Sequence, residues 1–210
     1  FKIKLIGSHI QITSPDGKIF KILITTNADQ NIPWIGEYDL FFECSGRNTI
    51  KKDCMQFLKG QTKTVVISAT SWDCDKTLIF GHNEVEFNPD KDKIVSYGSC
   101  TVNAYVPLAN YLNDKYGVLD SDVNVIHNIQ EYKVSENNTL IRKFCTLEKS
   151  AYNLIEGLNE NNFLVNYTLI PYSGVSMIDF RFALENCPSK NEIIDDLENQ
   201  IHDGKLKNIY

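Results

Sequence analysis

A strand–helix–strand pattern between residues 38 and 69 constrains the fold of this chain more than any other feature. Residues 38–44 form a mostly apolar run that predicts a buried strand, and residues 48–59 repeat apolar side chains near helical spacing before Gly60. Residues 64–69 are continuous and largely β-branched, as strands in parallel sheets tend to be. Because parallel strands need a crossover between them, these residues predict one βαβ unit with a right-handed connection.

The rest of the first half predicts short strands. These cover residues 1–5, 10–13, 20–24, 78–80 and 94–96. Pro15 and Gly17 lie between the second and third of them, where proline presets one dihedral angle and glycine accepts positive φ. We therefore expect a turn and a hairpin there.

The second half predicts long strands and separate helices, which is an α+β arrangement. A helix that follows Cys100 and ends at Gly117 places five side chains on one apolar face: Tyr105, Leu108, Ala109, Leu112 and Tyr116. Strands are expected over residues 123–129, 163–169 and 175–184, and a second helix near Thr146. The last helix begins at a capping box made by Ser189 and Glu192. Its apolar face comprises Ile193, Ile194, Leu197 and Ile201.

Composition narrows the class of protein. The 210 residues are 42% hydrophobic and 23% charged, with a formal net charge of −6, which is typical of a globular protein with an ample core. We find no basic stripe for nucleic acid and no apolar stretch near the roughly 18–20 residues that span a bilayer. The six cysteines are scattered, so we expect free thiols, no metal site and a cytoplasmic location.

Cys100 and His127 are the candidate catalytic pair. Cys100 lies where a strand gives way to a helix, and the positive end of a helix favours the thiolate, which is the nucleophilic form. His127 ends a strand-like run and is a candidate base. Alternatively, Cys100 is an inert buried thiol and His127 a satisfied core histidine. The pair alone also fits a thiol protease or an acyltransferase.

The segment SCTVNAYVPLANYLNDKYGV at residues 99–118 resembles the catalytic segment of glyceraldehyde-3-phosphate dehydrogenases. Cys100 matches the family's nucleophile, and the spacing of twenty-seven residues places His127 at its catalytic histidine. Residues 38–69 resemble part of the family's NAD domain, and residues 175–185 resemble its long sheet strand. The resemblance implies cofactor contacts from Ser45, Gly46, Ser68 and Ala69.

The resemblance also implies a division of the chain. Residues 1–99 would be a remnant of a Rossmann-type NAD domain without its first βαβ unit, and residues 100–210 an α+β catalytic domain with a mostly antiparallel or mixed sheet, without its C-terminal helix. The family's G-x-G-x-x-G turn would precede Phe1, and no such pattern occurs in the 210 residues. We therefore expect a fragment that binds NAD or NADP weakly.

Departures from the family pattern fall at its two anion sites. A threonine is replaced by Gln130, a strand arginine by Leu169, and the glycine of a Thr-Gly pair by Leu147. Leucine offers a phosphate no donor, whereas arginine binds it with a planar fork. The remaining candidate phosphate-binding residues are Ser99, Thr101, Thr146 and Arg142, although Ser99 and Thr101 fit helix capping equally well.

The function implied by the resemblance is NAD(P)-dependent oxidation of an aldehyde through a thiohemiacetal and thioester on Cys100, of the glycolytic type and possibly phosphorylating. The implied partners are a small aldehyde and further copies of the chain in a homotetramer, with neither nucleic acid nor membrane. A different hypothesis is a diverged, non-catalytic member that acts in binding or assembly. The altered anion sites leave the substrate open.

Overall fold

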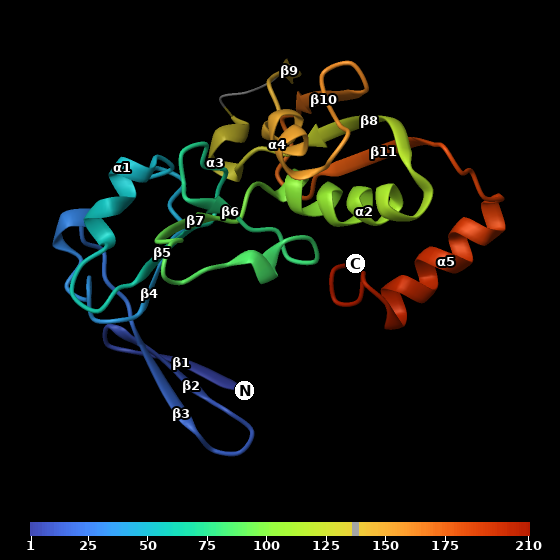
Figure 1. The fold of residues 1–210 in the computed structure, drawn as a ribbon. Coiled ribbons are helices and arrows are strands. Elements are labelled where there is room, and N and C mark those ends of the chain that lie inside the picture. The colour runs from blue at the N-terminus through green and yellow to red at the C-terminus, as the bar shows by residue number, and fades with distance from the viewer. Residues whose placement is uncertain (136–138) are drawn as a thin grey trace.

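The computed structural model describes residues 1–135 and 139–210, and the chain forms three sheets joined by helices (Figure 1). An antiparallel sheet, drawn in blue, comes first. A parallel sheet follows and leads into a mixed sheet in the second half of the chain. The fold class predicted from the sequence, α/β followed by α+β, is therefore confirmed.

The antiparallel sheet contains the predicted hairpin. Its strands are β1 (Lys2–Ile6), β2 (His9–Thr13) and β3 (Ile19–Leu23), in that order. Between β2 and β3, the Gly17 amide donates to the Ser14 carbonyl over 3.0 Å, and Gly17 has a φ of 83°. Positive φ is what glycine is suited to at such a turn.

The parallel sheet contains the predicted βαβ unit. Its strands are β4 (Leu40–Glu43), β5 (Thr64–Ile67), β7 (Ile94–Ser96) and β6 (Lys76–Thr77), in that order. Every neighbouring pair is parallel, and β5 is buried along its whole length. β4 lies at the sheet edge and is buried on one face only, with Phe41 stacked on Phe57 and Phe42 half exposed.

Two elements of this half differ from the prediction. The helix expected over residues 48–59 is short and consists of α1 (Lys51–Cys54) and the 3-10 turn η2 (Met55–Phe57). Asp73 accepts the Lys51 amide at its start, and Gly60, at positive φ, lies against Gly36 beyond its end. Both constraints come from residues distant in sequence.

The strand expected over residues 78–80 is the second difference, because the strand here is β6, Lys76–Thr77. The Asn83 side chain accepts from the Ile79 amide over 2.8 Å and donates to the Thr77 carbonyl over 3.0 Å. These bonds fold the backbone into a turn where apolarity alone suggests a strand.

The mixed sheet has the order β11 (Met177–Leu184), β8 (Val118–His127), β10 (Phe163–Leu169) and β9 (Ile141–Arg142). β10 runs parallel to β8, and β11 and β9 are antiparallel to their neighbours. β10 has the predicted bounds, whereas β8 begins five residues before the predicted Val123. The remaining short elements are η1 (Asp29–Asn31), η3 (Glu84–Glu86) and α3 (Glu131–Val134).

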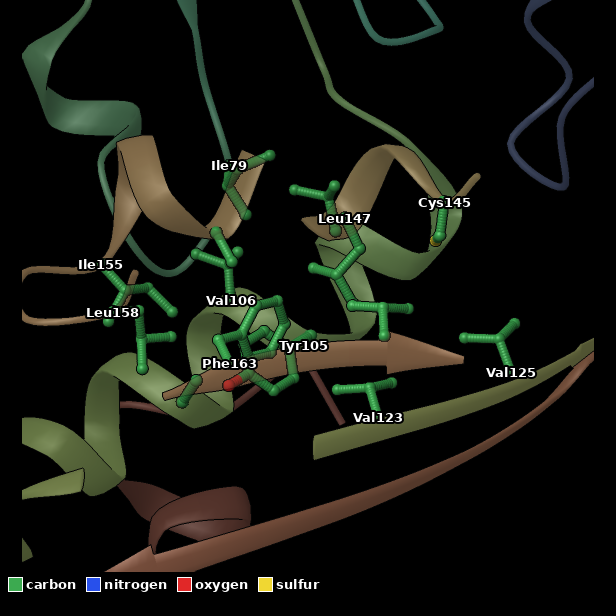
Figure 2. Packing of buried hydrophobic residues seen from close by; sticks show 14 residues of the cluster. Ile79, Tyr105, Val106, Val123, Val125, Cys145, Leu147, Ile155, Leu158 and Phe163 are labelled. Atoms are coloured by element: carbon green, nitrogen blue, oxygen red, sulfur yellow. The ribbon is translucent and has the colours of Figure 1, made fainter. Parts of the chain in front are cut away.

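Two helices cover one face of the mixed sheet and enclose the larger core (Figure 2). They are α2 (Cys100–Tyr116), which ends at Gly117 as predicted, and α4 (Thr146–Leu154). Tyr105 is fully buried at the centre, and its hydroxyl donates to Ser121 of β8 over 2.9 Å. This packing fixes the start of α2 relative to the end of β8.

The last helix, α5 (Lys190–Asp203), begins at the predicted capping box of Ser189 and Glu192. It packs on α2 through Ile193, Leu197 and Ile201, whereas Ile194, predicted on the same apolar face, is exposed. Lys115, Tyr111 and Tyr116 of α2 all contact the carboxylate of Asp196.

Candidate functional site

Cys100 is the first residue of α2 and is exposed. Ser99 is the N-cap, and its hydroxyl accepts from the Val102 amide over 3.3 Å. The amides of a first helical turn have no partner within the helix, and the helix dipole adds positive potential there. The Cys100 sulfur therefore lies where a negative charge is favoured.

The turn from β7 into α2 is fixed by Gly98 and Asn103. Gly98 has a φ of 71°, and a Cβ there would lie 3.1 Å from Ile79 and 3.2 Å from Val102. The Asn103 amide group donates to the carbonyls of Tyr97 and Ser99 over 2.7 Å and 2.9 Å. These contacts hold the strand end and the helix start in one geometry.

His127, the last residue of β8, faces the thiol. Its Nε2 lies 3.5 Å from the Cys100 Sγ, and its Nδ1 lies 2.7 Å from the carbonyl oxygen of Asn128. A carbonyl oxygen only accepts, so Nδ1 carries the proton and Nε2 presents a lone pair to the thiol. This is the geometry of a nucleophile with an adjacent base.

A small cavity of about 150 Å³ opens beside the Cys100–His127 pair. It is lined by Ser99, Cys100, Thr101, His127, Phe144, Cys145, Thr146 and Tyr167. The Thr101 hydroxyl lies 2.9 Å from that of Ser99 and 3.6 Å from the Cys145 sulfur. The first residues of α2 and α4 thus meet at this cavity.

Two ionisable groups in the wall of the small cavity, Tyr167 and Cys145, have raised pKa values. Burial raises the pKa of Tyr167 to about 12, and its ring centroid lies 5.4 Å from that of His127. Burial also raises the pKa of Cys145, although hydrogen bonds from Leu147 and Thr101 oppose it. Both groups therefore keep their protons near pH 7.

A second cavity of about 550 Å³ lies against Cys100 and shares Ser99 with the first. It is lined by Ser68, Leu78, Phe80, Glu84, Tyr97, Gly98, Ser99, Cys100 and Asn103. Phe80 and Tyr97 expose their aromatic rings. Cys100 therefore lies between two cavities, which is where a covalent nucleophile can meet two reactants.

Curated proteins similar to this chain are glyceraldehyde-3-phosphate dehydrogenases. That of Streptomyces avermitilis is 36% identical over 114 residues, 53% of this chain and 33% of its own length. The cytosolic enzyme of Arabidopsis thaliana is 30% identical over 195 residues, 86% of this chain and 56% of its own length. This chain is therefore similar in sequence to glyceraldehyde-3-phosphate dehydrogenases over most of its length. It spans about half or less of the length of these relatives, and no protein-family model matches it.

The structure brings most of the predicted substrate-binding residues of this family together. Ser99, Thr101 and Thr146 line the small cavity with Cys100 and His127. Arg142 does not. It pairs with Thr168 in the β9–β10 register, on the sheet face opposite His127, and its guanidinium donates to the Asn166 side chain.

The predicted cofactor residues follow the carboxyl ends of β4 and β5. Ser68 lines the larger cavity beside Cys100. Ser45, Gly46 and Ala69 do not line it, and the Ser45 hydroxyl donates to the carboxylate of Glu43. Of the four residues, the structure brings Ser68 alone to the catalytic pair.

The three residues that differ from the family pattern lie in different surroundings. Leu169 pairs with His127 in the parallel register, so both side chains project from the same sheet face. Gln130 is exposed and accepts from the Tyr132 hydroxyl over 2.7 Å. Leu147 is fully buried in the core.

Sequence reasoning missed Phe144, Cys145 and Tyr167 as lining residues. Cys145 precedes Thr146, so the predicted helix start was a signal for it. Tyr167 and Leu169 are two residues apart and lie on the same face of β10. That Tyr167 lies near His127 depends on the β8–β10 register, which the sequence does not reveal. Asn128 was missed because its backbone, and not its side chain, orients the histidine.

Neither a metal site nor a membrane-spanning helix is found within residues 1–135 and 139–210. No group of three or more histidine, cysteine or acidic side chains in that part of the chain is arranged to hold a metal ion. Nor does any described helix have the length and apolarity needed to cross a bilayer.

Proposed function

We propose that this protein is an NAD- or NADP-dependent aldehyde dehydrogenase that acts through a covalent intermediate on Cys100. The observation that carries the proposal is the 3.5 Å contact between the Cys100 Sγ and the Nε2 of His127, whose other nitrogen donates to the Asn128 carbonyl. The similarity to glyceraldehyde-3-phosphate dehydrogenases supports oxidation of an aldehyde over other chemistry of a Cys–His pair.

The larger cavity fits the nicotinamide end of the cofactor. It is mostly apolar, adjoins the Cys100 sulfur and is wide enough for a flat ring. Ser68, Leu78, Phe80 and Tyr97 would hold the ring there. When bound, the cofactor supplies a hydride acceptor.

His127 manages the protons of the reaction. It takes the thiol proton at Nε2 as the Cys100 Sγ forms a bond to the carbonyl carbon. The imidazolium then donates a hydrogen bond to the oxygen of the thiohemiacetal. When this carbon gives up its hydride, the oxygen re-forms a carbonyl group and Cys100 carries a thioester. His127 next releases its proton to solvent.

The thioester must then be released by an acyl acceptor, which is phosphate in a phosphorylating enzyme or water in a hydrolytic one. Attack at the acyl carbon breaks the C–S bond and returns Cys100 as a thiolate. Ser99, Thr101 and Thr146 are the side chains that face this step. We propose that residues 1–99 belong to the cofactor domain and residues 100–210 to the catalytic domain of a cytoplasmic homotetramer.

The direct test uses the full-length protein with an aldehyde panel, NAD or NADP, and phosphate. Formation of reduced cofactor is expected, and Cys100→Ser should abolish it. Cys187→Ser, which removes an exposed thiol far along the chain, should leave it unchanged. Absence of reduced cofactor with every aldehyde would overturn the proposal.

A non-catalytic role in binding or assembly is the second candidate. The orientation of Arg142 away from the small cavity favours this non-catalytic role. Without an arginine at the cavity, a phosphorylated substrate would lack a bidentate partner for its phosphate group. This candidate predicts that iodoacetamide alkylates Cys100 no faster than Cys187. Faster alkylation of Cys100 counts against it.

A further inference from the structure

We infer that a pocket whose lining includes Thr70, Trp72, Ser150 and Asn153 binds a neutral polyol with a sugar-like ring. This pocket, which we call the seam pocket, shares no lining residue with the two cavities beside Cys100. Binding there is therefore separate from the function proposed at Cys100.

The walls of the seam pocket come from both halves of the chain. The segment that follows β5 and contains β6 provides one wall, with Thr70, Trp72 and Asp75. The second half of α4 provides the other wall, with Ser150 and Asn153. The pocket is open to solvent, so its lining groups, and not its volume, decide which ligands fit.

Two hydroxyl groups of the lining residues have no hydrogen-bond partner. The Thr70 Oγ1 is buried without one. Ser150 is only 5% exposed, and its side chain makes no hydrogen bond within residues 1–135 and 139–210. Buried polar groups of folded proteins nearly always find a partner, so two unsatisfied hydroxyls at one pocket indicate a ligand or water that completes them.

The charged groups of the lining are already compensated. Asp75 forms an ion pair with Lys51, and its carboxylate also accepts from the Lys93 amide over 2.9 Å. Lys76 donates to the Glu86 carbonyl over 2.9 Å and lies 3.5 Å from the Glu86 carboxylate. A charged ligand would therefore lose hydration without gaining an unpaired opposite charge.

The groups left for a ligand are neutral. Besides the two hydroxyls they are the amide of Asn153, which is exposed, and the indole N–H of Trp72. Neither of these two side chains makes a hydrogen bond in the part of the chain that the structure describes. Hydroxyl and amide groups each donate and accept, which matches the hydroxyl groups of a polyol.

An aromatic and an aliphatic side chain give the seam pocket an apolar surface. Trp72 is 49% exposed, and the ammonium group of Lys149 lies 4.9 Å from its ring centroid, which helps to hold the indole in place. Leu154 adds an aliphatic side chain from α4. A sugar ring places C–H groups against such a surface and hydroxyl groups toward Thr70 and Ser150, whereas a purely apolar ring leaves both hydroxyls unsatisfied.

The test measures binding of glucose and myo-inositol to the full-length protein by saturation-transfer difference NMR. We expect a saturable signal with a dissociation constant below about 10 mM for at least one of them. Cyclohexanol, which has the ring of myo-inositol and one hydroxyl group, should bind at least about tenfold more weakly because several neutral hydrogen bonds are lost. Inorganic phosphate at equal concentration should not displace the polyol.

Two variants place the polyol in the seam pocket. Ser150→Ala and Thr70→Val should each weaken binding by about three- to tenfold, the effect of one neutral hydrogen bond. Alanine favours the helix, so Ser150→Ala should fold and decides the question if Thr70→Val does not. Ser8→Ala, at an exposed position of the β1–β2 turn, is the matched control and should leave binding unchanged.

Four results would overturn the inference. Absence of a saturable signal with both polyols would mean that water alone completes the two hydroxyls. Displacement by phosphate would show that an anion is preferred, and equal binding of cyclohexanol would show that hydroxyl groups are not recognised. Binding that Ser150→Ala leaves unchanged would place the polyol elsewhere on the protein.

Discussion

At the scale of single residues, the reactivity of this protein depends on what surrounds the Cys100 sulfur. The N-terminus of α2 supplies positive potential, and the Nε2 of His127 supplies a lone pair 3.5 Å away. The Asn128 carbonyl fixes which nitrogen carries the proton.

Replacing His127 by glutamine should lower turnover of the full-length enzyme by about a hundredfold or more, because general base catalysis typically contributes that factor. His202→Gln, at an exposed position of α5, is the matched control and should have no effect. Steady-state kinetics at saturating aldehyde provides the measurement. An unchanged rate in His127→Gln would exclude the histidine as the base.

At the scale of elements, the turn between β7 and α2 sets where the thiol lies. Gly98 combines positive φ with close packing against Ile79 and Val102, whereas Gly157 has positive φ with open space around it. The two positions therefore separate backbone strain from steric crowding.

Gly98→Ala should reduce the free energy of unfolding by about 1–3 kcal/mol more than Gly157→Ala, since overpacking adds to the backbone cost. It should also slow alkylation of Cys100, because α2 must shift to make room. Urea unfolding and the alkylation rate test the two effects. Equal destabilisation by both variants would show that packing at Gly98 is unimportant.

The contact between α2 and α5 makes stability depend on pH. Burial alone would raise the pKa of Asp196, but hydrogen bonds from Lys115, Tyr111 and Tyr116 outweigh it and hold the pKa below its usual value. A carboxyl group with a lowered folded pKa stabilises the fold above its unfolded pKa of about 3.9, and the contribution is lost as the pH falls through the folded value.

Asp196→Asn should therefore lower the free energy of unfolding by about 1–3 kcal/mol at pH 7 and by less at pH 3. Asp195→Asn, at the exposed neighbouring position, should change it little at either pH. Urea unfolding at the two pH values provides the measurement. A loss in Asp196→Asn that does not depend on pH would contradict the ionic origin.

Elements with a clear pattern of apolar residues were predictable from sequence, and elements shaped by contacts with distant residues were not. The strand at residues 64–67 and the helix after Cys100 are specified by the apolar pattern of their own residues. The short α1 and the missing strand at residues 78–80 depend on Asp73 and Asn83, whose side chains take over backbone groups. In the site, the predicted Cys100–His127 contact is found, but the Arg142 orientation follows from a sheet register that no local pattern encodes.

At the scale of the whole molecule, the site lies where the parallel sheet ends and the mixed sheet begins. β7 leads directly into α2, and Tyr105 of α2 links that helix to β8 through Ser121. Ser121 in turn donates to the Arg181 carbonyl of β11 over 2.8 Å. The stability of the second half and the geometry of the site therefore depend on the same core.

Tyr105→Ala should lower the free energy of unfolding by about 3–5 kcal/mol, the usual cost of removing a fully buried aromatic side chain. Tyr172→Ala, which alters an exposed ring, should cost under about 0.5 kcal/mol. Denaturant unfolding gives both values. A small effect of Tyr105→Ala would mean that α2 is held by other contacts.

We expect Cys100 to be an activated nucleophile and His127 to be its base. The rate of iodoacetamide alkylation at each cysteine, measured at pH 7 by peptide mass spectrometry, tests it most directly. We predict that Cys100 reacts at least about tenfold faster than the exposed Cys44 and Cys187, and that His127→Gln removes the difference. Equal rates at the three exposed thiols, or an unchanged Cys100 rate in His127→Gln, would contradict it.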